Sequence, residues 1–208
     1  VNLTLANPTR DKILATDTVT VESRNTTSER TTLDGNFATG VLEPGDDLEL
    51  RANVTAGEDG YTNTTTTLDN VRPGDNPSVL GDLVLKANDA TVETNATLSV
   101  APDEDTTVTF SLETGQTQLS TRTKTVTAES TETGDVSLPA NFSNEALDAG
   151  DTLTVRASTS AGYETATTNV SSDIRPGDTV ATSDALSLDA RDATVEARAT
   201  LQTAPAQE

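Results

Sequence analysis

The chain contains no cysteine, histidine, methionine or tryptophan among its 208 residues. Without cysteine there are no disulfides, no thiol nucleophile and no thiolate metal centre. Without histidine the chain also lacks the commonest general base and the commonest metal ligand. A hydrolase that uses carboxylates alone stays open, although no motif supports one. We therefore expect no enzyme, no metal site and no cofactor.

Acidic clusters are the remaining candidates for cation binding. They are Asp46 with Asp47, residues 103–105, and the last residues of two RPGD turns, Asp75 and Asp178. Carboxylate oxygens suit Ca²⁺, but no stretch has the twelve-residue spacing of a dedicated calcium loop. We expect these groups to be solvated carboxylates in turns.

Basic residues are few, with 13 lysines and arginines against 34 aspartates and glutamates, for a net charge of -21. No basic stripe exists to neutralise phosphates, so nucleic acid is not a predicted partner. An acidic surface of this strength is tolerable when salt screens it. The acid-rich, lysine-poor, threonine-rich composition resembles that of proteins from extremely halophilic archaea, although a generic acidic protein stays open.

Large apolar residues are also scarce, because Val, Leu, Ile and Phe together number 42 of 208. This fraction lies near the range of disordered chains. Apolar residues nevertheless alternate with polar ones in short runs, and Pro-Gly or Ala-Gly turns separate these runs. No helical stripe is present. The pattern predicts an all-β fold of short antiparallel strands at the spacing of a β-sandwich; the alternating runs contain Val19 and Val21, Leu48 and Leu50, Val108 with Phe110 and Leu112, Leu153 and Val155, and Leu186 and Leu188.

An internal repeat divides the chain. Residues 147–178, LDAGDTLTVRASTSAGYETATTNVSSDIRPGD, are a second copy of residues 42–75, LEPGDDLELRANVTAGEDGYTNTTTTLDNVRPGD. The offset between the copies stays within 102 to 105 residues. Two domains of about a hundred residues are typical in size. We predict one β-sandwich domain over residues 1–93 and another over 94–196.

The motifs DGNFATGVLEPGDDLELRANVTAGEDGY and NFSNEALDAGDTLTVRASTSAGYETATT resemble carboxypeptidase-regulatory-like domains. The resemblance covers about 35 residues of each copy. It implies two tandem immunoglobulin-like, more narrowly transthyretin-like, sandwiches of the kind found in haloarchaeal cell-surface proteins. Such domains are structural or adhesive, and no active-site residues are carried over. Four of the five aromatic residues occupy paired positions and are expected to anchor the cores rather than form a binding platform: Phe37, Phe142, Tyr61 and Tyr163.

Glycosylation acceptor motifs are about twice as frequent as chance predicts, since seven of thirteen asparagines have one in a chain with 56 serines and threonines. A threonine-rich chain can also make such motifs by accident. We predict N-linked glycans at several of them, with polar surroundings favouring the second and fourth: Asn2, Asn25, Asn53, Asn63, Asn95, Asn141 and Asn169.

The last residues copy a strand that has already been used. DATVEARATLQTAP, residues 192–205, repeats DATVETNATLSVAP, residues 89–102. We therefore predict that 197–208 form an orphan strand with Leu201 facing inward between Thr200 and Gln202. VNLTLANP at the start is interpreted as the same first strand, with Pro8, Pro102 and Pro205 at equivalent ends.

The orphan strand has two interpretations, a cut through a longer array or β-strand addition to a neighbouring molecule. We favour a structural subunit of an extracellular, glycosylated filament or pilus-like cell-surface assembly, with copies of itself as head-to-tail partners. A surface-layer glycoprotein or adhesin stalk is the alternative, and a carbohydrate-binding accessory module the third. No signal peptide or membrane span is present, as expected for a processed extracellular chain or a fragment, without direct membrane insertion.

Overall fold

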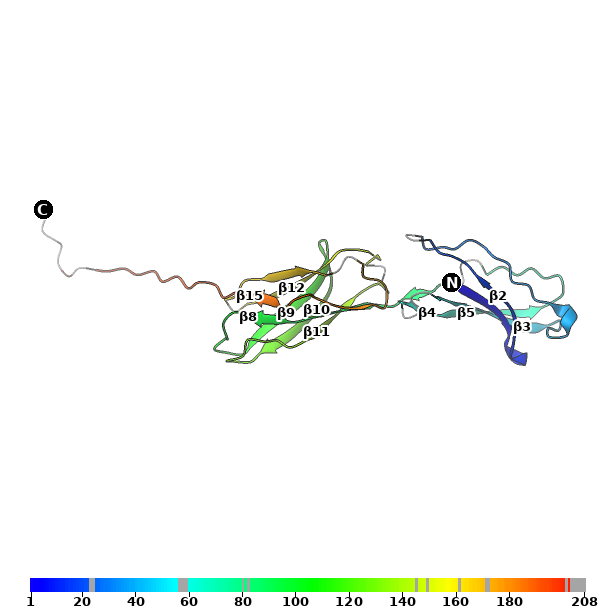
Figure 1. Cartoon of the computed structure of the whole chain (residues 1–208), viewed down its shortest axis with the longest axis horizontal. Coiled ribbons are helices and arrows are strands. Elements are labelled where there is room, and N and C mark those ends of the chain that lie inside the picture. Colours follow the sequence, from blue (N-terminus) through cyan, green and yellow to red (C-terminus); the bar gives the residue numbers. More distant parts are fainter. Residues whose placement is uncertain are drawn as a thin grey trace.

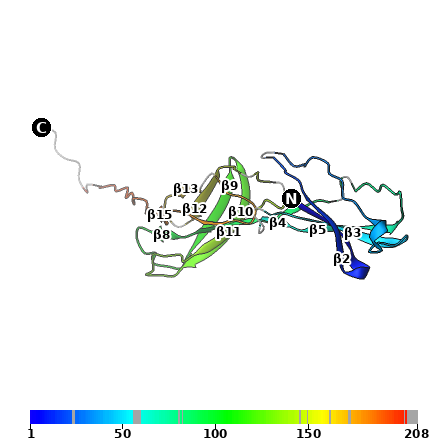
Figure 2. The same cartoon turned by 45° about the vertical axis from the view of Figure 1, so that its right-hand side comes forward.

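A computed structural model describes residues 1–22, 25–55, 60–79, 81, 83–144, 146–148, 150–160, 162–170, 173–200 and 202. Within these ranges the fold is all-β, as the sequence predicts, with fifteen strands and two 3-10 turns. No helix of the described chain has the length and apolarity needed to cross a membrane. The strands gather in two groups that lie end to end, and a C-terminal segment extends away from the second group (Figure 1). The view in Figure 2 shows the same arrangement.

The N-terminal half contains one four-stranded antiparallel sheet in the order β2-β1-β3-β5 and a short β4-β6 ladder. Asparagine side chains begin both 3-10 turns by accepting a backbone N–H, from Arg10 in η1 and from Ala38 in η2. The elements of this half are β1 (Asn2–Asn7), η1 (Pro8–Arg10), β2 (Lys12–Thr18), η2 (Phe37–Thr39), β3 (Asp46–Asn53), β4 (Tyr61–Thr62), β5 (Thr64–Val71) and β6 (Lys86–Ala87).

The C-terminal half has three sheets, in the orders β10-β9-β12-β13, β11-β7-β14 and β15-β8. The last two contain the parallel pairs, β14 with β7 and β15 with β8. The strands of this half are β7 (Ala90–Thr94), β8 (Ala96–Leu98), β9 (Thr106–Thr114), β10 (Thr117–Val126), β11 (Val136–Ala140), β12 (Leu153–Thr159), β13 (Ala166–Asn169), β14 (Thr179–Ala181) and β15 (Leu186–Leu188).

Period-two alternation places apolar side chains in the cores, as predicted. Val108, Phe110 and Leu112 of β9 are fully buried, whereas Thr107 before them is exposed and Thr109 is half-buried; Ser111 is the exception, at 7% exposed. The alternating pairs on β3, β12 and β15 are buried in the same way. The run at Val19 and Val21 is an exception, because β2 ends at Thr18 and Val21 is exposed.

The turns use the chemistry that their sequences predict. In each of four Asp-ended turns, the aspartate carboxylate accepts the backbone N–H of the residue three positions earlier, and the aspartate N–H donates back to that residue's carbonyl. The glycine before the aspartate has a positive φ, which only glycine adopts without cost. The four aspartates are Asp46, Asp75, Asp151 and Asp178.

Strand pairing shows that the two four-stranded sheets are copies. β1 lies between β2 and β3, just as β9 lies between β10 and β12. Leu5 is opposite Leu50 as Leu112 is opposite Val155, and both hairpins have a register shift, at Leu14 in one and at Leu119 in the other. Thus VNLTLAN of β1 matches VTFSLET of β9. The interpretation of VNLTLANP as a counterpart of ATLSVAP is wrong, because Pro8 begins the turn of a hairpin.

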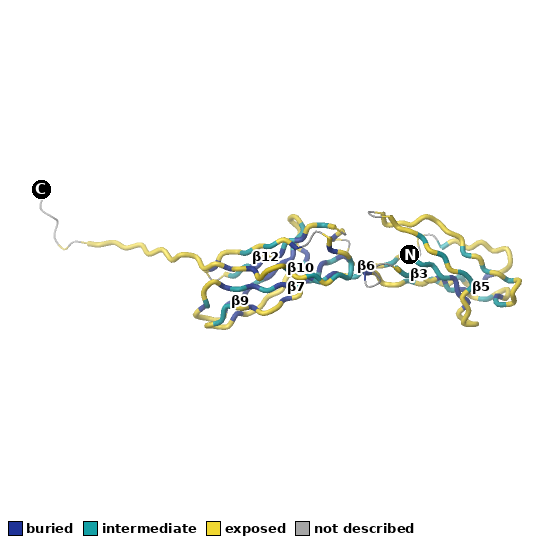
Figure 3. Tube along the Cα trace, viewed as in Figure 1, coloured by how far each residue is buried: buried dark blue, intermediate teal, exposed yellow. Residues whose placement is uncertain are grey.

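Two separate apolar clusters underlie the two halves. The first contains Leu5, Leu42, Leu48, Leu50 and Val71, whereas the second is several times larger. Figure 3 shows buried residues along most strands of the second group and fewer in the first. β7 pairs with β11 and β14, and its Ala90 and Val92 belong to the second cluster. The sequence places residues 90–93 in the first domain, but their packing is with the second group.

Candidate functional site

The first strands of the C-terminal half, β7 and β8, are paired with other strands of that half and contribute to its core. β7 lies at the centre of its sheet, antiparallel to β11 and parallel to β14, and β8 continues it beside β15. Every second residue points into the core, so that five of the eight strand residues are buried. They are Ala90, Val92, Thr94, Ala96 and Leu98, each at most 5% exposed.

Residues 192–202 copy this strand in sequence, and the described ones, 192–200 and 202, are exposed. Residues 191–200 have no assigned secondary structure and are all exposed, with Val195 at 87%. At the repeat offset of 103 residues, the buried positions of β7 and β8 correspond to Ala193, Val195, Ala197, Ala199 and Leu201. Every one of these is apolar. Figures 1 and 3 show the segment running straight into solvent.

The predicted contact residues fall at the end of this segment. Thr200 and Gln202 are exposed, whereas Leu201 lies outside the described residues. The sequence pattern does not identify the four inward-facing positions before Leu201, which are Ala193, Val195, Ala197 and Ala199. Alanine does not stand out in an alternating pattern, and only the burial of β7 and β8 shows that these positions face a core.

The N-terminal half has no described strand in the place that β7 and β8 occupy. Residues 31–35 match β11 and residues 76–78 match β14, but neither segment pairs in a sheet. Leu33, Leu83 and Leu85 are only half-buried. Their counterparts in the C-terminal half are at most 3% exposed: Leu138, Leu186 and Leu188. We call residues 31–35, 76–78, Leu83 and Leu85 the open face.

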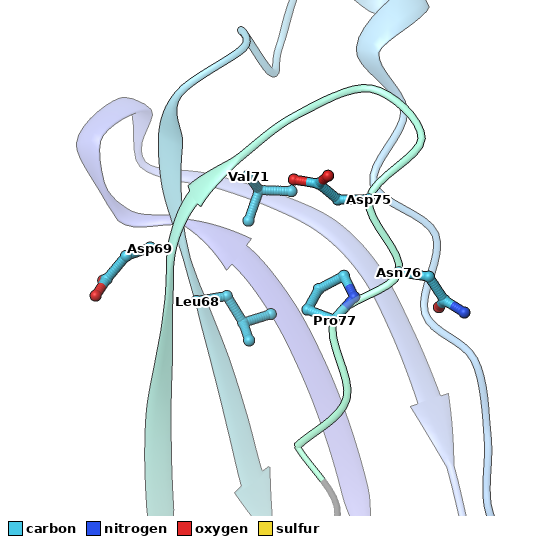
Figure 4. Close-up of a pocket in the computed structure, with 6 residues that line it drawn as sticks. All are labelled: Leu68, Asp69, Val71, Asp75, Asn76 and Pro77. Carbon is cyan, nitrogen blue, oxygen red and sulfur yellow. The ribbon is translucent and has the colours of Figure 1, made fainter.

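Two further observations, at opposite ends of the N-terminal sheet, concern apolar residues of the N-terminal half. Val21 is 37% exposed, although its counterpart Val126 is completely buried at the end of β10. A pocket of about 320 Å³ lies where β5 faces the segment 75–77. In Figure 4 the side chain of Leu68 points toward Pro77 and that of Val71 toward Asp75, while Asp69 points away. The counterpart of Pro77 is Val180, which pairs with Val92 of β7. Apolar surface is thus left open beside the missing strand.

The aromatic pairs do not both behave as core anchors. Phe142 and Tyr163 are buried, and the Tyr163 hydroxyl donates to the carbonyl of Val100 at 2.8 Å. Phe37 is half-buried against the first cluster, and Tyr61 is 36% exposed. The expectation of core anchoring therefore holds in the C-terminal half and only in part in the N-terminal half. This difference again shows that the first core is less covered.

Acidic side chains in the turns serve the backbone. The N–H of Glu43 donates to the Asp46 carboxylate and lowers the pKa of that group, with further help from the Asn7 amide and Arg10. Asp75 and Asp178 accept backbone N–H groups in the same manner. Asp47 accepts the N–H of Asn70, and Asp105 that of Ala128. Among the described residues no group of three or more acidic side chains is placed to hold a metal ion.

The seven glycosylation motifs differ in how accessible their amides are. Asn25, Asn63 and Asn169 are exposed, and Asn2 and Asn53 are half-buried. The side-chain amide of Asn141 donates to the carbonyl of Leu119, and that of Asn95 donates to Asp135. A glycan requires this nitrogen, so the exposed sites are the better acceptors.

We expect native material to exceed the 21.6 kDa of the polypeptide by several glycans. Glycopeptide mapping should find Asn25, Asn63 and Asn169 occupied before Asn95 and Asn141, because the last two amides hydrogen-bond within the protein. Intact-mass analysis measures the total. A mass equal to that of the bare chain would contradict the use of these motifs.

Comparison with known proteins adds no assignment. The chain matches no protein-family model, and a search of curated proteins finds no significant match. The resemblance to carboxypeptidase-regulatory-like domains therefore stays an interpretation of the sequence motifs.

Proposed function

We propose that this protein is a structural subunit of an extracellular filament, whose copies join head to tail when the C-terminal segment of one adds a strand to the next. The segment 192–202, exposed at 192–200 and at 202, is the observation that carries the proposal. It repeats a strand that is buried in the same molecule, and it has an apolar residue at every buried position. Strand addition combines backbone hydrogen bonds with pockets for alternate side chains.

The rest of the molecule suits a structural role. Both halves are interpreted as immunoglobulin-like sandwiches, end to end along the long axis (Figure 1). An interface between a tail and a different surface does not close on itself, so it propagates into a fibre. The acidic composition and the acceptor asparagines favour a glycosylated surface assembly in a salt-rich medium, as in haloarchaea.

The alternatives are weaker for specific reasons. An exposed aromatic pair would favour a carbohydrate-binding module, and the paired tyrosines do not form one because Tyr163 is buried. A surface-layer or adhesin stalk would join the same domains covalently in one long chain. That alternative predicts that the 208-residue chain alone stays monomeric.

Removing residues 192–208 should abolish assembly while both halves remain folded. Val195→Asp should have nearly the same effect, because it places a charge where the counterpart Val92 is completely buried. Thr194→Asp is the matched control, since it adds the same charge at a position whose counterpart Thr91 does not face the core. Light scattering and negative-stain microscopy in molar salt measure assembly. Normal fibres from the shortened chain would rule out the proposal.

A further inference from the structure

We infer that the open face of the N-terminal half is the acceptor, and that it receives residues 193–201 of a second copy in the register of β7 and β8. This inference rests on the proposed function and names the surface that the function requires. The occupant is identified by the internal repeat, because the chain contains two versions of one strand. One version is buried in the C-terminal half, and the other is exposed.

The segment 31–35, which pairs with no described strand of a sheet, has at its centre the same alternation of burial as β11. In β11, Leu138 is buried, while Ser137 faces outward and donates through its hydroxyl to Glu93 of β7 at 2.8 Å. The matching residues Thr32 and Leu33 have the same alternation, exposed and half-buried. This segment is therefore already oriented like β11, with an apolar residue toward the core. Ser137 pairs with Glu93, so Thr32 is expected to pair with Glu196 of the second copy.

The backbone hydrogen bond that holds the start of β7 recurs at the start of the exposed segment. Before β7, the N–H of Asn88 donates to the carbonyl of Gly60 at 2.9 Å. Before the exposed segment, the N–H of Arg191 donates to the carbonyl of Gly162 at 2.8 Å. Tyr61 is opposite Ala87, and Tyr163 is opposite Ala190. The segment thus leaves the C-terminal half as β7 leaves the N-terminal half.

The RPGD turn that contacts β7 and the residues before it also occurs in both halves. Gly177 donates its N–H to Asn88, and Thr91 of β7 donates to the carbonyl of Asp178. The RPGD turn of the N-terminal half has the same shape, but its Pro73, Gly74 and Asp75 are all exposed. In the proposed contact, Gly74 and Asp75 take the places of Gly177 and Asp178. Each junction between copies would then repeat the junction inside the chain.

The segment cannot reach the open face of its own molecule. Arg191 is held by Gly162, so two residues, about 7 Å of chain, precede the first inserted position at Ala193. The nine-residue strand β9 of the C-terminal half alone spans about 30 Å. Figure 1 shows the segment leaving at the end remote from the N-terminal half. The N-terminal half of the same 208 residues is therefore not the partner.

Paired cysteines test this register, and the chain has no cysteine of its own. We expect a mixture of T32C chains and E196C chains to form disulfide-linked heterodimers under mild oxidation. Asp34 faces outward two residues further along, so D34C mixed with E196C is the control and should cross-link at least tenfold less. Both sites are exposed, so folding should not suffer. Non-reducing gels measure the product, and light scattering of the unaltered chain measures assembly in parallel.

The outcomes separate the two proposals. Assembly without preferential T32C–E196C cross-linking would overturn the acceptor site and leave the filament standing. Another outcome is a disulfide within a single chain that carries both T32C and E196C at high dilution. It would show that the open face is occupied by the tail of its own chain, and it would overturn the proposed contact between copies. Absence of both assembly and cross-linked dimers would remove the filament together with its acceptor. Cross-linking at T32C and not at D34C supports the assigned register.

Discussion

Dialysis from molar to millimolar salt is expected to unfold the isolated subunit. The net charge of -21 is spread over a chain of 208 residues. The Debye length grows from about 3 Å at 1 M to about 30 Å at 0.01 M, so repulsion between distant carboxylates is no longer screened. Such self-repulsion destabilises the compact state. The strand signal in circular dichroism should be lost as salt is removed.

The ion pairs in the structure cannot offset this repulsion. Three are present among the described residues, all in the N-terminal half: Arg10 with Glu43, Arg10 with Asp46, and Arg51 with Glu49. Exposed pairs of this kind contribute about 0–1 kcal/mol each. The C-terminal half therefore depends on its larger core, and the N-terminal half should unfold first.

The control for the salt experiment compares sodium chloride with potassium chloride at equal ionic strength. Screening predicts equal protection by both salts, whereas specific cation binding predicts a difference. A melting temperature that does not change between molar and millimolar salt would contradict the halophilic interpretation.

Much of the fold could be predicted because it follows from local chemistry. Leu48 with Leu50, Leu153 with Val155, and the triplet of β9 alternate strictly, and strict alternation fixes which face of a strand is buried. The turns could also be predicted from the sequence, because proline fixes one backbone angle, glycine allows a positive φ and aspartate accepts a hydrogen bond from the backbone of the turn. These features need no knowledge of partner strands.

What could not be predicted depends on partners far apart in the sequence. A short apolar strand that ends in proline looks the same whether it is the first strand of a sandwich or an inner one. The sequence therefore predicts the wrong counterpart for VNLTLANP, and only its pairing with β2 and β3 shows that it corresponds to β9. The same limit applies to residues 90–93, whose partners β11 and β14 lie over forty residues away.

The candidate site was half visible in the sequence. The copy of residues 89–102 at 192–205 is a plain repeat, so an orphan strand and its Leu201 could be predicted. Ala193, Val195, Ala197 and Ala199 were missed because alternation of alanine with polar residues carries little signal. The acceptor surface could not be predicted from the sequence. Leu33, Leu83 and Leu85 indicate an uncovered surface only when their half-burial is compared with the full burial of their counterparts in the C-terminal half.

Supplying the missing strand within one chain should stop assembly and stabilise the N-terminal half. The change is a second copy of residues 89–107 placed directly before Val1. Thr107 precedes Val108, and Val1 matches Val108 by strand pairing, so the added strand enters in register. A tethered strand acts at an effective concentration in the millimolar range, far above that of a neighbouring tail. The altered chain should be monomeric in molar salt where the unaltered chain forms fibres.

The stabilisation follows from the side chains that the added strand buries. The valine and leucine that correspond to Val92 and Leu98 each contribute about 1.5–3 kcal/mol when buried. A net gain of about 2 kcal/mol raises the melting temperature of a domain this size by about 10 °C. The control carries aspartate at these two positions of the added copy, and it should assemble and melt like the unaltered chain. Fibres from the completed chain, or an unchanged melting temperature of its N-terminal half, would mean that the open face does not accept this strand.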